Sequence, residues 1–255
     1  MKKLFSFFPM TVGTYDSFVS KVVDLGMKKR SSYVCVANVH MMGEAKKDPS
    51  YAKIINEADL VTPDGMPLVL AMRWLYNVPQ ERVAGCDLFP SLLNEAAKKN
   101  LNVFFLGSTQ DVLNKLEDKC IRNIPKLKIA GKYSPPFRQA TEDEQKALIK
   151  IINDSNSHII FVALGCPKQE KWMASMKGKI QGVMIGVGNA FPVYAGIEKL
   201  APQWMRRLSL EWVYRFAQDP QRLWKRYIVN NSMFIWWFSI EWFRLRLTFK
   251  KIKYS

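Results

Sequence analysis

The sequence contains few of the residues that build metal sites and nucleotide-hydrolysing sites. Its two histidines, His40 and His158, are too few for a His-rich metal site. None of the four cysteines forms a CxxC pair, which fits a reducing cytoplasm. The chain also lacks a DxD sequence, a GxxxxGK(S/T) loop and a full GxGxxG fingerprint, so ATP hydrolysis is unsupported and a nicotinamide enzyme is weakly supported. We therefore expect neither a metal nor a cofactor.

Long apolar runs, internal repeats and low-complexity tracts are absent as well. The longest aromatic segment is interrupted by Glu241 and Arg244 before it reaches the roughly 20 residues needed to cross a bilayer. The first ten residues imitate a signal peptide, but Ser6 and Pro9 interrupt them and no small-residue cleavage site follows. We interpret them as an ordinary N-terminus. At 255 residues with 48% hydrophobic residues, the chain can bury one substantial core and carry a small appendage.

The net charge of +16 is concentrated near the C-terminus. Residues 199–255 hold twelve Lys and Arg against three Asp and Glu, and they hold six of the eight tryptophans. Cations interleaved with Trp favour an anionic membrane surface, because indole rings prefer the level of the lipid headgroups. Basic patches also bind nucleic acid, which stays an alternative, although we expect no nucleic-acid partner.

Short apolar runs alternate with segments of helical periodicity over most of the chain, which predicts an α/β fold with a Rossmann-like, mainly parallel sheet flanked by helices. The expected strands are 33–37, 58–62, 102–106, 158–164 and 183–187, and the expected helices are 50–57, 66–76, 87–100, 110–122, 142–153 and 168–176.

Near Pro202 the alternation gives way to helices alone. We therefore divide the chain into a catalytic core, residues 1–198, and a helical, basic and Trp-rich appendage, residues 199–255. The pair Asp219-Pro220 predicts a helix that begins at Pro220 and runs to about Val229. The aromatic segment that follows suits an amphipathic helix in the membrane plane, and the alternative is a helix packed on the core or on a second subunit.

Polar side chains follow the expected strands, where parallel α/β sheets bind their ligands. Asp64, between Pro63 and Gly65, is either a helix cap or a general base that takes a proton from a substrate hydroxyl. Arg82 either holds an anionic ligand group or pairs with Asp64. Asn38, which has His40 close behind it, offers a donor and an acceptor to a uracil edge or a sugar hydroxyl, or it caps a helix.

Three further strand-to-helix turns are candidate ligand sites. The first can cradle a diphosphate with backbone amides and hydroxyls, the second allows close backbone approach to a ligand, and the third offers an amide to sugar hydroxyls and a cation to phosphate. In the order just described, these turns carry Gly107, Ser108 and Thr109; Gly186, Gly188 and Asn189; and Lys168 and Gln169. The second turn lies later in the chain than the third.

The motifs together resemble the WecG/TagA/CpsF family of bacterial glycosyltransferases over roughly residues 10 to 230. The resemblance is carried by Asn38-Val-His40, Ala58 to Met66 with its Pro-Asp-Gly, Arg82-Val-Ala-Gly85, Phe104 to Gly107, Gly165 to Trp172, Gly186-Val-Gly188, Ala201 to Met205 and Leu210-Glu-Trp212.

The resemblance implies an inverting, metal-independent enzyme that moves a sugar, of the N-acetylmannosamine type or another hexose, from a UDP-sugar to a lipid-diphosphate-linked sugar. It implies a location at the inner face of the bacterial cytoplasmic membrane. It also implies Asp64 as the catalytic base, Gln169 and Asn38 in the substrate pocket, and Arg82 as a substrate contact. Arg215, Arg222 and Lys225 of the appendage would supply cations for the developing diphosphate charge.

Two other function classes stay open on the sequence alone. A nucleotide-dependent oxidoreductase would use the α/β alternation and the paired glycines, and a non-enzymatic basic adaptor for membrane or nucleic acid would use the C-terminal charge. The adaptor leaves the polar strand ends unexplained. The donor sugar, the acceptor sugar and the oligomeric state stay undetermined, and a homo-oligomer is among the partners that the sequence allows.

Overall fold

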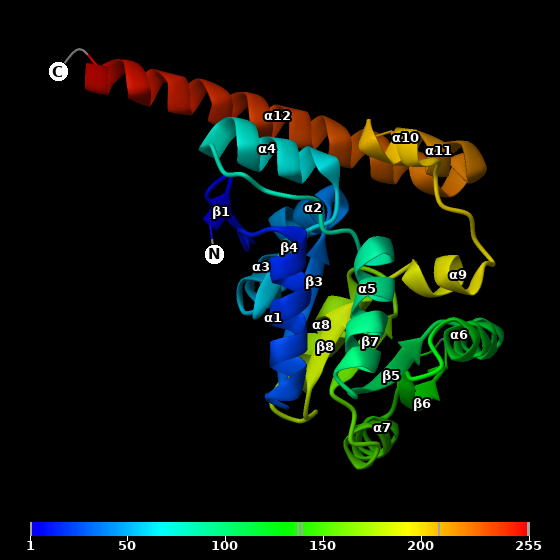
Figure 1. Ribbon diagram of the computed structural model, residues 1–255. Coiled ribbons are helices and arrows are strands. Elements are labelled where there is room, and N and C mark those ends of the chain that lie inside the picture. The colour runs from blue at the N-terminus through cyan, green and yellow to red at the C-terminus, as the bar shows by residue number, and fades with distance from the viewer. Residues whose placement is uncertain (1, 137, 139, 209, 254–255) are drawn as a thin grey trace.

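A parallel sheet forms the centre of the computed structural model, which describes residues 2–136, 138, 140–208 and 210–253, with several side chains near both ends left undescribed (Figure 1). The sheet has six strands in the order β4-β3-β8-β7-β5-β6, and all neighbouring pairs are parallel. This confirms the Rossmann-like α/β prediction. The strands are β3 (Ser32–Ala37), β4 (Leu60–Pro63), β5 (Asn102–Gly107), β6 (Lys128–Tyr133), β7 (Ile159–Ala163) and β8 (Val183–Gly186).

Helices cover both faces of the sheet, because the alternating side chains of each strand point to opposite sides. Tyr33, Cys35 and Ala37 of β3 join one apolar cluster, whereas Val34 and Val36 join the other. The first cluster is completed by α2 (Val39–Lys47), α3 (Pro49–Asn56), α4 (Met66–Tyr76), α7 (Glu142–Asp154) and α8 (Lys168–Met176); the second is completed by α1 (Tyr15–Met27), α5 (Gly85–Lys98), α6 (Gln110–Asn123) and α9 (Ala190–Ala195).

The sequence located five of the six sheet strands to within about two residues at each end, but it missed several elements. It missed β6, whose residues are exposed or half-buried and therefore show no apolar run. It also missed α1, and it indicated α2 only through the interpretation of Asn38 as a helix cap. The stretch interpreted as an ordinary N-terminus forms a hairpin of two short antiparallel strands, β1 (Lys2–Leu4) and β2 (Phe8–Met10).

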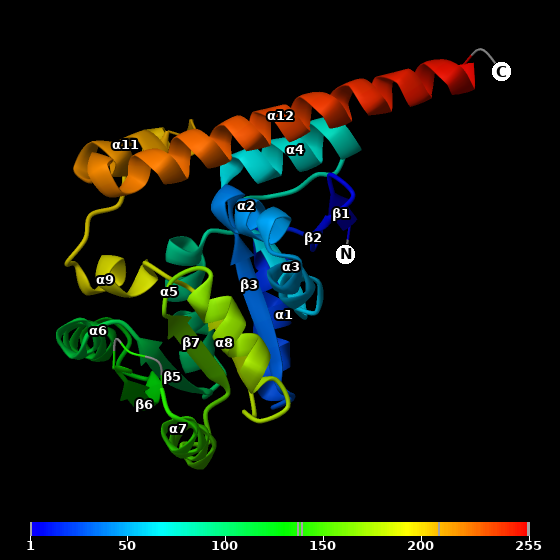
Figure 2. The ribbon, with the colours of Figure 1, turned by 180° about the vertical axis from the view of Figure 1, so that it is seen from behind.

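The C-terminal part consists of helices α10 (Gln203–Arg207), α11 (Glu211–Gln218) and α12 (Pro220–Lys253). Helix α12 begins at Pro220 as predicted, but the prediction that it ends near Val229 is wrong. It is 34 residues long in all and ends at Lys253, because apolar side chains keep recurring on the face that packs against α4 and the hairpin (Figure 2). Among the described residues, none of the helices combines the length and the apolar composition that crossing a membrane requires.

The inner face of α12 is held by aromatic contacts. Phe234 lies 5.7 Å from Phe5 between ring centroids, and Trp237 lies 5.5 Å from Phe7. Glu241 is buried on the same face and accepts a hydrogen bond from the hydroxyl of Tyr76 at 3.2 Å. This face packs on the core, as one of the two sequence interpretations stated.

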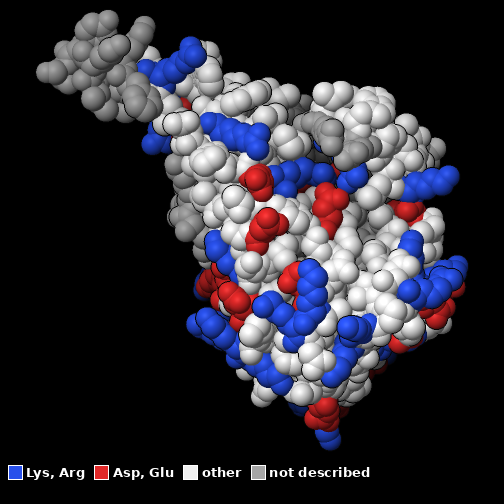
Figure 3. Space-filling view, viewed as in Figure 1, with Lys and Arg blue, Asp and Glu red and all other residues white. Residues whose placement is uncertain are grey.

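The outer face of α12 is also apolar, but it is exposed. In Figure 3 the described surface of the C-terminal helices has white patches beside blue Lys and Arg side chains, whereas acidic and basic residues are mixed farther down the molecule. Trp236 and Phe243 are 66% and 65% exposed, and Trp74 of the neighbouring α4 is 62% exposed. We call the following residues the outer face of α12: Trp224, Ile228, Val229, Ile235, Trp236, Ile240, Phe243 and Leu247.

Candidate active site

The strand register brings Asn38 and Asp64 to one edge of the sheet. Ala37 of β3 pairs with Pro63 of β4, so the next residue of each strand leaves the sheet beside the other. The main-chain N–H of Asp64 donates to the carbonyl of Ala37 at 2.7 Å. Asn38 is the N-cap of α2, as one interpretation expected, and its Oδ1 accepts from the N–H of Met41 at 3.1 Å. The N-cap of α4 is Gly65, so Asp64 does not fill that position.

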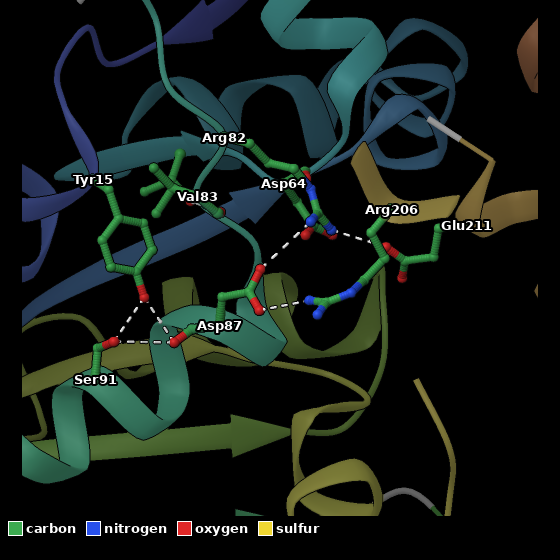
Figure 4. A network of polar contacts seen from close by, with 9 residues as sticks. Tyr15, Asp64, Arg82, Val83, Asp87, Ser91, Arg206 and Glu211 are labelled. Atoms are coloured by element: carbon green, nitrogen blue, oxygen red, sulfur yellow. Dashed lines mark hydrogen bonds and ion pairs between the residues drawn. The ribbon is translucent and has the colours of Figure 1, made fainter. Parts of the chain in front are cut away.

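Arg82 connects this edge to two carboxylates (Figure 4). Its Nε donates to the main-chain carbonyl of Asp64 at 2.7 Å. Its guanidinium forms ion pairs with Glu211 of α11 at 2.9 Å and with Asp87 of α5 at 3.4 Å. The side chain is only 19% exposed, so these contacts hold the guanidinium in place beside Asp64.

A second arginine reaches the same carboxylate from the C-terminal helices. Arg206 of α10 lies 2.9 Å from Asp87, on the oxygen that Arg82 does not contact (Figure 4). The main-chain carbonyl of Asp87 accepts from the hydroxyl of Tyr15, and burial raises the pKa of that phenol. Ion pairs through Asp87 and Glu211 therefore join the C-terminal helices to the core at the sheet edge.

Two cavities meet at this edge. The larger has a volume of about 700 Å³ and the smaller about 140 Å³. The larger cavity runs along the glycine turn after β8 and past Ser108, and the smaller runs under α12, where His40 and Asn230 line it. Five residues line both cavities, namely Asn38, Asp64, Arg82, Arg206 and Glu211. Asp64 is therefore in the wall that the cavities share.

Gln169 lies in the wall of the larger cavity and is 4% exposed. Its Nε2 donates to Glu170 at 2.7 Å. A Cβ at position 186 would lie 2.8 Å from this Nε2, so Gly186 makes room for the Gln169 amide. The expectation that this glycine allows close approach of a ligand is therefore refined, because the approaching group is a side chain of the protein.

Glu170 lies beneath Gln169 and is fully buried. Its other carboxylate oxygen accepts from the hydroxyl of Tyr51 at 3.0 Å. Burial raises the pKa of the Glu170 carboxyl, against the opposing effect of its hydrogen bonds with Gln169, Tyr51 and Cys166. The carboxyl group is therefore an internal anchor and makes no contact with solvent.

The described residues contain three buried polar side-chain atoms without a hydrogen-bond partner, and all three belong to residues that line the cavities. They are Oε1 of Gln169, Nε of Arg206 and Oδ1 of Asn230. Buried polar groups are nearly always paired, because an unpaired one costs about 1–3 kcal/mol. Their concentration here marks the cavity walls as places where a ligand completes the hydrogen bonding.

Other expected site residues occupy different positions. Of the described ones, Lys168, Gly107 and Thr109 lie outside both cavity walls. Lys168 is exposed on α8 and Thr109 caps α6, while a Cβ on Gly107 would meet the carbonyl of Ala163. Ser108, Gly186, Gly188 and Asn189 do line the larger cavity. The side chains of Arg215, Arg222 and Lys225 fall outside the described part of the structure.

Sequence reasoning missed four residues of the site. Arg206, Glu211 and Asn230 come from the C-terminal helices; Glu211 lies in the Leu210-Glu-Trp212 motif of the resemblance but was given no role, and nothing in the local sequence separates Arg206 and Asn230 from surface residues. Glu170 was also missed, because adjacent residues of a helix point about 100° apart, so the position after Gln169 carries no local sign of its burial. Within the described ranges no three His, Cys, Asp or Glu side chains gather as a metal-binding group.

Comparisons with known proteins agree with the sequence resemblance. A model of the family described as "Glycosyl transferase WecG/TagA/CpsF family" matches residues 5–248. The chain is 36% identical over 200 residues to an N-acetylglucosaminyldiphosphoundecaprenol N-acetyl-beta-D-mannosaminyltransferase of Bacillus subtilis strain 168, covering 78% of this chain and 76% of that protein.

Enzymes of the same name from two other bacteria are also similar. The identity is 34% over 212 residues for Bacillus spizizenii, covering 82% of this chain and 80% of that protein. It is 29% over 192 residues for Staphylococcus aureus strain MW2, covering 75% of this chain and 74% of that protein. These matches favour a sugar-transferring enzyme over the oxidoreductase and the adaptor.

Proposed function

Because this chain belongs to the glycosyl transferase WecG/TagA/CpsF family, we propose that it transfers an N-acetylmannosamine-type sugar from a UDP-sugar to N-acetylglucosamine carried on undecaprenyl diphosphate. The relatives are named for this acceptor and this sugar. The product serves the synthesis of a bacterial surface polysaccharide or teichoic acid. The observation that carries the proposal is the position of Asp64 in the wall shared by two cavities of unequal size.

The larger cavity is assigned to the UDP-sugar. Its volume suits a nucleotide sugar, and its wall contains the polar strand ends, the glycine turn after β8 and Ser108. The smaller cavity is assigned to the acceptor sugar. It lies under α12, where Asn230 and Trp212 line it, so the lipid of the acceptor would leave the site close to the outer face of α12.

Asp64 acts as the general base in this arrangement. From the shared wall its carboxylate accepts the proton of the acceptor hydroxyl while that oxygen attacks the anomeric carbon on the face opposite UDP. The configuration at that carbon inverts in a single displacement. Arg82 and Arg206 are the two described cations that line both cavities, and from there they would offset the charge that develops on the departing diphosphate. Arg215 and Arg222 would add to them, as the resemblance implies.

The acceptor places the enzyme at a membrane. The outer face of α12, with Trp74 beside it, gives an apolar surface next to a segment rich in Lys and Arg. Such a surface lies in the headgroup region of an anionic bilayer. We therefore propose that the protein binds peripherally at the inner face of the cytoplasmic membrane and works without a metal or other cofactor.

A UDP-release assay tests the proposal. Purified full-length protein is given UDP-N-acetylmannosamine, a short-chain lipid-diphosphate-N-acetylglucosamine acceptor, or both, with and without a chelator. We expect UDP only when both substrates are present, at a rate that the chelator does not change, and a product of inverted configuration. A parallel reaction replaces the donor with UDP-N-acetylglucosamine. UDP release with that donor and none with UDP-N-acetylmannosamine would overturn the sugar assignment, and loss of activity with the chelator would overturn the metal-independent mechanism.

A further inference from the structure

We propose that Glu170 is a positioning residue that fixes the amide of Gln169 so that the amide oxygen faces the larger cavity as a hydrogen-bond acceptor for an O–H or N–H group of the sugar donor. This inference rests on the proposed function for the identity of the ligand. The orientation of the amide stands on contacts within the protein.

The orientation follows from donor and acceptor chemistry. The hydrogen bond between the two side chains runs from Nε2 of Gln169 to Oε1 of Glu170 at 2.7 Å, so the amide nitrogen is the atom that faces the carboxyl group. The amide oxygen then points the other way, and Oε1 is the atom without a partner among the described residues. Gln169 is 4% exposed and lines the larger cavity, so this oxygen is a buried acceptor at the cavity wall.

The anchor itself is held by the surrounding helices. Tyr51 of α3, 1% exposed, donates to the second oxygen of Glu170 at 3.0 Å. The Tyr51 hydroxyl also lies 3.4 Å from the Cys166 sulfur. Because both oxygens of Glu170 have partners on different elements, the carboxyl group cannot turn without breaking one of them. These two hydrogen bonds therefore hold the Glu170 carboxyl group in one orientation.

The opposite side of the amide is confined by the main chain. A Cβ at Gly186 would lie 2.8 Å from Nε2 of Gln169, and one at Gly188 would lie 3.8 Å from Oε1. The amide therefore lies between the Glu170 carboxyl and the glycine turn after β8. Two independent substitutions, one on each side, should misplace the same oxygen.

The test is a double-mutant cycle read by kcat/KM in the UDP-release assay. Glu170→Leu removes the acceptor, and we expect a loss of about 10- to 100-fold, since the oxygen no longer holds its place in the cavity. Gly186→Ala should give a loss in the same range from the other side. Glu170→Gln is the matched control, because its carbonyl can still accept from Gln169, and it should stay within about threefold of the unchanged protein.

Each substitution is then repeated in a Gln169→Ala background. We expect Glu170→Leu to cost almost nothing more there, because its effect passes through the missing amide. An equal loss in both backgrounds would overturn the positioning role in favour of a purely structural one. If Glu170→Leu does not fold, Tyr51→Phe, which removes the hydroxyl that holds the second oxygen of Glu170, takes its place in the cycle, and an equal loss in both backgrounds again overturns the positioning role.

A readout independent of catalysis separates this inference from the proposed function. The side-chain amide of Gln169, identified by its disappearance in Gln169→Ala, should be protected from hydrogen exchange in the free protein and should lose protection in Glu170→Leu. Fast exchange in the unchanged protein would overturn the proposed orientation. If no UDP-sugar gives UDP release while the amide is protected, the proposed function fails and the orientation stands.

Discussion

The parallel-sheet core and the C-terminal helices treat their apolar residues in opposite ways. In the core, the strands and the inner sides of the helices bury nearly all of their large apolar side chains on the two faces of the sheet. In the C-terminal helices, four tryptophans are exposed, and α12 is apolar on two opposite faces. The apolar side chains of the core are therefore buried by packing within the core, whereas the C-terminal helices expose apolar surface that suits a second environment.

This difference indicates which region of the molecule suits each of its two proposed tasks, sugar transfer and membrane binding. The polar groups that suit sugar transfer lie at strand ends, on rigid elements of the core. Surface suited to a bilayer lies on α12, which is joined to the core by its inner aromatic face and by the ion pairs at Arg82 and Arg206. Substitutions should then separate chemistry, folding and membrane binding.

The largest effect is expected at Asp64. Asp64→Asn removes the proton acceptor while keeping the shape, so turnover should fall by about 10³-fold. The melting temperature and binding to vesicles should stay unchanged, which would confine the defect to the core's chemistry. The measurement is UDP release beside thermal unfolding and liposome sedimentation.

The control for that substitution lies on the other end of the same strand. Asp59 accepts from the N–H of Tyr33 at 3.0 Å and pairs with Lys177, far from the cavity walls. Asp59→Asn should lower stability and leave turnover per folded molecule intact. Near-normal turnover in Asp64→Asn would show that another group takes the proton.

The inner face of α12 should govern folding. Phe234 is 9% exposed and packs on Phe5, so Phe234→Ala should lower the free energy of unfolding by about 3 kcal/mol. The adjacent residue is the matched control, because Ile235 is 63% exposed. Ile235→Ala should change that free energy by under about 0.5 kcal/mol in urea titrations. Equal costs at the two positions would mean that the faces of α12 do not differ as described.

The outer face should govern membrane recruitment. The double change Trp236→Ser and Phe243→Ser should weaken binding to anionic vesicles by about 10- to 100-fold, because less apolar surface enters the headgroup region. Stability and turnover on a water-soluble acceptor should be unaffected. Ile121→Ser, at an exposed apolar position on α6, is the control and should bind normally. Unchanged vesicle binding in the double variant would remove α12 as the membrane contact.

The smallest effect is expected at the ion pair between the two regions. Glu211→Gln weakens the contact with Arg82, and we expect a loss of under about 1 kcal/mol in unfolding free energy that shrinks further at high salt. Asp111→Asn breaks the exposed pair with Lys115 on α6 and should cost less still. A loss of several kcal/mol in Glu211→Gln would show that the ion pairs, and not the aromatic contacts, join the regions.

Much of the core could be predicted from the sequence, because buried parallel strands produce continuous apolar runs. β3 and β7 show this pattern, and edge strand β6 does not. Helix α1 was missed although Thr14 caps it and Phe18, Val22 and Val23 recur at helical spacing. The cap and the apolar spacing together indicate this helix in the sequence alone.

The site could be predicted only where topology alone assembles it. Asn38, Asp64, Gln169 and the glycine turn follow strands, and a parallel sheet brings such residues to one edge. Arg206 and Asn230 reach the cavities through the packing of α10 and α12 on the core, which no local pattern encodes. The division at residues 198 and 199 stays a prediction, as do the roles assigned to the site residues.

The hairpin of β1 and β2 packs its Phe5 and Phe7 against α12, so these two side chains are covered only when α12 is in place. During synthesis the N-terminal segment leaves the ribosome long before its partner, and an isolated two-stranded hairpin is only marginally stable. Closure of this contact is therefore a late event, because it has to wait until α12 has been synthesised. A shortened protein that ends before α12 would expose Phe5 and Phe7. It would lose the apolar outer face of α12 and gain a new exposed apolar surface on the hairpin.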